Sequence, residues 1–95
     1  MRVIHIKDKS KYSNTEYIGR GSVFGNPYHV QKHGRNTCIE KYRQYFYERL
    51  ERDVKFKEAV HSLKIKDRNK ELCLVCYCKP LDCHGDIIKE YCDNL

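Results

Sequence analysis

The sequence predicts a single small α/β domain over residues 1 to 95, with a short, mostly parallel sheet and three flanking helices. A chain of 95 residues is long enough for one compact core and too short for two. Its pattern runs strand, loop, two helices, buried strand, helix. The helical connection between the strands favours parallel pairing, as in other small α/β units.

The first part of the chain predicts short strands and one long loop. Residues 2 to 7 form a β-branched run with polar ends, which indicates an opening strand. Tyr17 and Ile18 predict a second short strand, and residues 19 to 27 form the longest loop of the chain. Pro27 disfavours helical geometry at Asn26, so we expect this loop to stay irregular.

Two consecutive helices are predicted after the loop. The first covers residues 38 to 50, because apolar residues recur there at helical spacing and Thr37 with Glu40 fits a capping box. The second begins with Asp53 as its cap and ends before Lys64, where a polar stretch starts.

Residues 71 to 78 are nearly all apolar, which predicts a central strand buried on both faces. Side chains alternate along a strand, so Cys76 and Cys78 are expected on the face of Leu74, and Cys73 on the other face. A last amphipathic helix is predicted to start between His84 and Asp86.

Composition indicates a protein of the cytoplasm, or of the host cytoplasm if it is viral. No apolar run is long enough for a membrane helix, and the N-terminal residues lack the apolar stretch of a signal peptide. Thiols stay reduced in such a compartment, so we expect the six cysteines to be core residues, reactive groups or metal ligands. Cys38, Cys73 and Cys92 are expected in the core.

The net charge of +6 belongs entirely to the first part of the chain. Residues 1 to 50 contain 10 Lys and Arg against 4 Asp and Glu, whereas the remaining residues contain nine of each kind. This asymmetry predicts an anionic partner for the N-terminal region, either a small molecule or a nucleic acid, and no membrane.

Residues 76 to 86, CYCKPLDCHGD, place thiols, an imidazole and carboxylates where the buried strand leads into the last helix. A helix start favours a thiolate, so Cys83 is a candidate nucleophile, with His84 or Asp86 as its assisting groups. A purely structural interpretation also stands, with buried cysteines and a capped helix.

Metal binding is the other interpretation of this segment. Cys76, Cys78, Cys83 and His84 make up a Cys₃His set of the kind that holds zinc, and three cysteines are also a ligand set for an iron-sulfur cluster. The spacing differs from that of zinc knuckles, which join two separated ligand pairs.

The glycine loop offers groups suited to an anion. Backbone amides near the glycines, a guanidinium, a hydroxyl and a carboxamide are typical of phosphate sites, and the candidates are Gly19, Arg20, Gly21, Ser22, Gly25 and Asn26. Phe24 or Tyr28 is placed to stack on a ring. A glycine-rich turn with core aromatics is the structural alternative.

The two segments together resemble the family called domain of unknown function 4326, found in phages, other large DNA viruses and bacteria. The resemblance rests on YIGRGSVFGNPY at residues 17 to 28 and on CYCKPLDCHGD at residues 76 to 86, and it extends over nearly the whole chain. It implies that the shared positions of both motifs meet in one site. These positions are Arg20, Ser22, Asn26, Cys76, Cys78, Cys83, His84 and Asp86.

From these observations we expect a pocket for a nucleotide-like or other phosphorylated ligand between the two segments, with thiol chemistry at Cys83. One alternative is a basic nucleic-acid-binding module that carries zinc or an iron-sulfur cluster. The other is a viral protein that binds a host protein.

Overall fold

The predicted central strand lies between two parallel partners in the computed structural model, which describes residues 1–95. The strands are β1 (Arg2–His5), β2 (Thr15–Tyr17) and β3 (Cys73–Cys76), in the order β1-β3-β2. β3 pairs with both neighbours in parallel. All three carboxyl ends therefore meet at one edge of the sheet, as the predicted α/β class requires.

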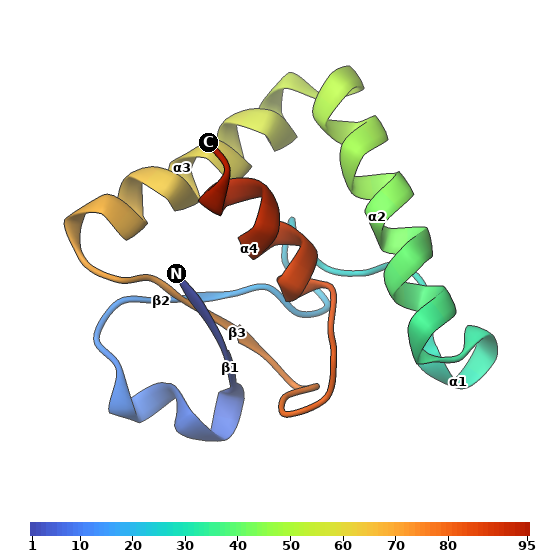
Figure 1. The fold of residues 1–95 in the computed structure, drawn as a ribbon, viewed down its shortest axis with the longest axis horizontal. Coiled ribbons are helices and arrows are strands. Elements are labelled where there is room, and N and C mark those ends of the chain that lie inside the picture. The colour runs from blue at the N-terminus through green and yellow to red at the C-terminus, as the bar shows by residue number, and fades with distance from the viewer.

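Helices cover both faces of this sheet unequally (Figure 1). One face carries the three long helices, and the other carries a single 3₁₀ helix. The helical elements are η1 (Ile6–Lys11), α1 (Val30–His33), α2 (Arg35–Arg52), α3 (Val54–Asn69) and α4 (Gly85–Asp93). None of these helices is both long and apolar enough to cross a bilayer.

The core divides along the two faces of β3, as its alternation predicts. Leu74 and Cys76 belong to the large cluster under α2, α3 and α4, whereas Cys73 and Val75 pack with Ile4 beneath η1. The helices contribute to the large cluster through regularly spaced residues, which are Tyr42, Phe46, Leu50, Phe56, Val60, Leu63, Ile87, Ile88 and Cys92. Cys38, Cys73 and Cys92 are all buried, as expected.

The start of α2 differs from the prediction. The helix begins at Arg35 and not at residue 38, with Gly34 in the N-cap position at φ +79°. Gly34 adopts this left-handed conformation between α1 and α2, so the second helix follows the first without a linker. Thr37 therefore lies inside the first turn, and the predicted capping box with Glu40 is wrong.

The second predicted helix, α3, begins where the sequence predicts and ends later than predicted. Asp53 caps α3 by accepting a hydrogen bond from the Phe56 amide at 3.1 Å. The helix then continues through the polar stretch to Asn69. Asn14 explains the extension, since its side-chain nitrogen donates to the carbonyls of Lys66 at 3.1 Å and Lys70 at 2.8 Å.

β1 and β3 are both shorter than predicted. β1 ends at His5, whose side chain accepts the Lys7 amide at 3.0 Å as the chain turns into η1. β3 ends at Cys76, where its pairing with His5 stops. No strand pairs with the chain after Cys76, so residues 77 and 78 are free to leave the sheet.

Gly85 allows α4 to start against the sheet. A Cβ atom at this position would lie 2.7 Å from Ile18 Cδ1 and 3.0 Å from Val3 Cγ1. Both distances are shorter than ordinary van der Waals contacts, so only glycine fits without movement of the core.

We predict that Gly85→Ala lowers the free energy of unfolding by about 1 to 3 kcal/mol, the usual cost of overpacking. The sign of the change in unfolding free energy distinguishes overpacking from helix propensity, because Gly→Ala in an exposed helix stabilises by about 1 kcal/mol. Urea denaturation measures the change. Thr37→Ala, at an exposed position in the first turn of α2, is the control and should stay within about 0.5 kcal/mol of wild type. A Gly85→Ala protein as stable as wild type would contradict the packing argument.

Candidate functional site

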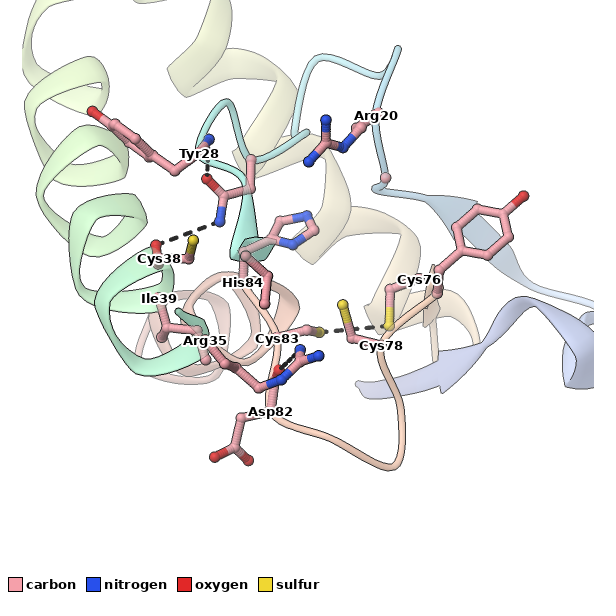
Figure 2. A pocket seen from close by; sticks show the side chains of 14 residues that line it. Arg20, Tyr28, Arg35, Cys38, Ile39, Cys76, Cys78, Asp82, Cys83 and His84 are labelled. Carbon is pink, nitrogen blue, oxygen red and sulfur yellow. Dashed lines mark hydrogen bonds between the residues drawn. The ribbon is translucent and has the colours of Figure 1, made fainter. Parts of the chain in front are cut away.

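A cavity of about 120 Å³ lies at the carboxyl edge of the sheet. It is enclosed between the glycine loop, residues 19 to 27, and the Cys-His segment, residues 76 to 86. The chain contributes to it from the loop after β2, the end of β3, the starts of α1 and α2, and the turn before α4 (Figure 2). Its walls are formed by Gly19, Arg20, Asn26, Tyr28, Val30, Arg35, Cys38, Ile39, Cys76, Tyr77, Cys78, Asp82, Cys83 and His84. The structure therefore brings the two motifs together, although 47 residues, 29 to 75, separate them in sequence.

Only part of the glycine loop faces the cavity. Gly19, Arg20 and Asn26 line it, whereas Gly21, Ser22 and Gly25 do not. Ser22 holds the loop in shape instead: its hydroxyl and its amide both donate to the Gly19 carbonyl, at 2.7 Å and 3.1 Å. The hydroxyl is therefore occupied within the turn and is not presented to a ligand.

Asn26 joins the loop to α2. Its side-chain oxygen accepts the Tyr28 amide at 2.9 Å, and its side-chain nitrogen donates to the Cys38 carbonyl at 3.4 Å. This pattern is that of an Asx turn with an added tertiary contact. Asn26 thus fixes one wall of the cavity, and both polar atoms of its carboxamide already have protein partners.

Two thiols meet at the buried side of the cavity. Cys76 ends β3 and Cys83 precedes α4, and they are 1% and 2% exposed. The Cys83 thiol donates to the sulfur of Cys76, with 3.5 Å between the two Sγ atoms (Figure 2). Cys78 is half-buried on the same side of the cavity.

The two thiols differ in how readily they ionise. The hydrogen bond from Cys83 lowers the pKa of Cys76, and the amides of Cys78 and Lys79 act in the same direction. The same hydrogen bond raises the pKa of Cys83, and burial raises it further. These contacts therefore favour ionisation of Cys76 over ionisation of Cys83. Sequence reasoning assigned the nucleophile to Cys83, because the tertiary contact with Cys76 was not apparent.

Asp86 does not line the cavity. One carboxylate oxygen accepts the Cys83 amide at 3.1 Å, and the other accepts the Lys79 ammonium at 2.8 Å. These bonds close the turn before α4 and hold Lys79 beside the thiol pair. The geometry thus gives Asp86 a positioning role and does not support proton transfer to a ligand.

His84 is buried and connects the two motifs directly. Its Nε2 lies 2.7 Å from the Ile18 carbonyl oxygen, which can only accept, so Nε2 carries the proton. The ring packs edge-on against Tyr42, with 4.9 Å between ring centroids. Its other nitrogen, Nδ1, has no hydrogen-bond partner in the protein, and no unpartnered side-chain nitrogen or oxygen is fully buried. Because His84 lines the cavity, its Nδ1 is available to accept a hydrogen bond there.

Positive charge predominates around the opening. Arg20 and Arg35 line the cavity, and Asp82 is the one acidic residue that does. Arg20 bonds to His29 with 3.0 Å between nitrogens, and Arg35 donates to the Asp82 carbonyl at 2.9 Å. Each guanidinium has further N–H donors beyond these bonds.

The structure does not assemble the proposed metal ligands. No group of three or more His, Cys, Asp or Glu side chains is arranged to hold a metal ion. The geometry thus gives no support to the alternative of zinc or an iron-sulfur cluster on Cys76, Cys78, Cys83 and His84.

Sequence reasoning missed the contribution of α2 to the cavity. Arg35, Cys38 and Ile39 line it from the first turn and a half of that helix. No motif marks these residues. The helical period identified Ile39 only as apolar, and Cys38 was assigned to the core alone. Arg35 could have been found from the charge excess in residues 1 to 50, but not distinguished there from the other basic residues.

Comparison with known proteins adds one finding. The model of a family described as Domain of unknown function (DUF4326) matches residues 2–94, which include both motifs. No curated protein and no solved structure matches the chain. What the site does must therefore be argued from its own chemistry.

We predict that His84 makes folding stability pH-dependent. Burial lowers the pKa of its imidazole, so the unfolded chain binds a proton near pH 6.5 that the folded chain does not. The free energy of unfolding should therefore fall as the pH drops below about 6.5, with a slope approaching 1.4 kcal/mol per pH unit. Urea denaturation between pH 7.5 and 5.5 measures it.

His84→Gln separates this effect from other titrations, because the glutamine amide can still donate to Ile18 but does not ionise. Its stability should depend less on pH than that of wild type over the same range. His61→Gln removes an imidazole on α3 outside the cavity and serves as the control. Equal slopes for His84→Gln and wild type would show that His84 is not held neutral.

Proposed function

The chain belongs to the family described as Domain of unknown function (DUF4326), and from this premise we propose that it binds the phosphate of a nucleotide-like or other phosphorylated small molecule. The site is the cavity between the glycine loop and the Cys-His segment. The observation that carries the proposal is the convergence of both motifs, with two arginines, on one cavity at the carboxyl edge of a parallel sheet.

The charges favour an anion. Arg20 and Arg35 come from different elements and both line the cavity. The first turn of α2 contributes lining residues, and Cys83 and His84 line the cavity directly before α4. The positive end of a helix dipole favours negative charge at such places. Oxyanions are bound in other α/β proteins by this combination of guanidinium groups and helix starts.

The size of the cavity limits what is enclosed. A volume of about 120 Å³ is close to that of an engineered cavity of about 150 Å³ that accommodates benzene. A phosphate group or a single ring fits this space, whereas a whole nucleotide does not. The remainder of such a ligand would extend outward past Tyr28 and Tyr77, whose rings offer stacking surfaces.

Thiol chemistry on the ligand is part of the proposal. Cys76, Cys78 and Cys83 all line the cavity, so a group enclosed there is within reach of a sulfur nucleophile. His84 supports this role through its free Nδ1, which can accept a proton or a hydrogen bond from the ligand.

Removal of either arginine tests the proposal. We predict that Arg20→Gln and Arg35→Gln each weaken binding of a phosphorylated ligand at least about tenfold, the usual cost of losing one charge-assisted hydrogen bond. The panel contains inorganic phosphate, ribose 5-phosphate, nucleoside mono- and diphosphates, and a short single-stranded oligonucleotide. Thermal shift screens the panel, and calorimetry measures the affinities.

Arg68→Gln is the matched control, since it removes one positive charge from an exposed position on α3 that does not line the cavity. It should bind as wild type does. No binding across the panel, or equal losses in all three variants, would contradict the proposal. Binding of the oligonucleotide alone, with an affinity that falls steeply with salt, would favour the nucleic-acid alternative.

A further inference from the structure

The thiol pair has an asymmetric set of hydrogen bonds. Cys76 accepts a hydrogen bond from the Cys83 thiol, with 3.5 Å between the two Sγ atoms, and the nearby amides of Cys78 and Lys79 also lower the pKa of Cys76. Cys83 donates its own proton to Cys76, and this bond together with burial raises the pKa of Cys83. Lys79 adds a positive charge that favours an anionic sulfur at Cys76.

The cavity gives small molecules access to this pair. Both sulfurs belong to residues that line it, although neither side chain is exposed on the outer surface. A cavity of about 120 Å³ admits a molecule with a few heavy atoms and excludes a folded protein or a large disulfide. Of the other buried cysteines, Cys38 lines the cavity from α2, whereas Cys73 is on the opposite face of the sheet and Cys92 donates toward the Val60 carbonyl.

We propose that Cys76 and Cys83 form a dithiol that reacts with small hydroperoxides, in which Cys76 is oxidised first and Cys83 closes a disulfide with it. The reactive partner is thus a small electrophilic oxygen donor, such as hydrogen peroxide. The helix start predicts Cys83 as the nucleophile, whereas here Cys76 reacts first and Cys83 is the resolving thiol.

The reaction balances in two steps. The Cys76 thiolate attacks one oxygen of the hydroperoxide, an S–O bond forms, and the O–O bond breaks. The leaving alkoxide or hydroxide takes up the proton that Cys76 had released. The Cys83 sulfur then attacks Cys76 Sγ, an S–S bond forms, and the S–O bond breaks with loss of water, which carries away the Cys83 proton. Two thiols are oxidised, and one hydroperoxide is reduced to an alcohol and water.

The distances permit the second step. The two sulfurs are 3.5 Å apart, and a disulfide requires about 2.05 Å. Their approach needs a shift of about 1.5 Å, which follows from the same two distances. Cys83 lies in the turn before α4 and not within a strand or helix, so its side chain is not held by a ladder of backbone bonds on both sides.

This inference uses the cavity of the proposed function but not the phosphorylated ligand. A dithiol that reacts with peroxide without any ligand would stand even if no member of the ligand panel bound. Conversely, ligand binding that depends on Arg20 and Arg35 would stand if the thiols proved unreactive.

The test is oxidation of the reduced protein by hydrogen peroxide in the absence of ligand. We expect the number of free thiols to fall from six to four and the mass to drop by two hydrogens, both reversed by a reductant. Fragmentation of the peptide should place the bond between Cys76 and Cys83. The rate should change less than twofold between pH 8 and 7, against about eightfold for an ordinary thiol of the unfolded chain in urea.

Variants assign the order of events. Cys83→Ser should stop at a sulfenic acid on Cys76, trapped by dimedone, and Cys76→Ser should leave Cys83 reduced. Cys73→Ser is the control and should react as wild type does, because Cys73 faces the other side of the sheet. Circular dichroism and thermal melting establish that each variant folds, and Cys76→Ala replaces Cys76→Ser if the hydroxyl prevents folding.

Three results would overturn the proposal. The first is a sulfenic acid that forms on Cys78 before Cys76. The second is oxidation spread over all six cysteines, as in the unfolded chain. The third is an unchanged disulfide product in the Cys76→Ser variant. All three are read from the same mass spectra, and the wild-type results do not depend on the folding of any variant.

Discussion

The contact between the end of β2 and the start of α4 is the constraint on which the site depends. His84 donates to the Ile18 carbonyl at 2.7 Å, and Gly85 approaches the Ile18 side chain so closely that no Cβ atom fits. Ile18 itself continues the sheet by donating its amide to the Val75 carbonyl at 3.0 Å. One residue thus joins the central strand, the glycine loop and the last helix. Without the contacts of Ile18, the two motifs would not line the same cavity.

The interior of the cavity follows from that junction. Because α4 starts against the sheet, Cys83 lies over the end of β3, within hydrogen-bond distance of Cys76. Asp86 and Lys79 close the turn between them and place a positive charge near the sulfurs. α2 completes the enclosure, held by Asn26 on one side and by the bond from Arg35 to the Asp82 carbonyl on the other. The arginines at the opening and the buried thiol pair are therefore parts of a single packed unit.

Sequence patterns predicted the elements well where the physics is local. The apolar run containing β3, the cap at Asp53 and the alternation of Leu74 and Cys73 all depend on neighbouring residues. Element ends were less predictable, because they depend on distant partners. α3 extends to Asn69 because Asn14, from another part of the chain, binds its terminal carbonyls, and a pattern of periodicity contains no information about such a contact.

The sequence by itself determined the α/β class, the central place of β3 and the two segments from which the site is built. Periodicity, turn residues and chain connectivity decide these features, and all three are properties of the sequence order. Only the tertiary structure decided which side chains face the cavity. It placed Ser22 and Asp86 in supporting turns, brought Arg35 from α2 into the wall, and lowered the pKa of Cys76 through its contact with Cys83. The physical reason is that ionisation and orientation depend on atoms within a few ångströms, and in a packed core those atoms come from residues far apart in sequence.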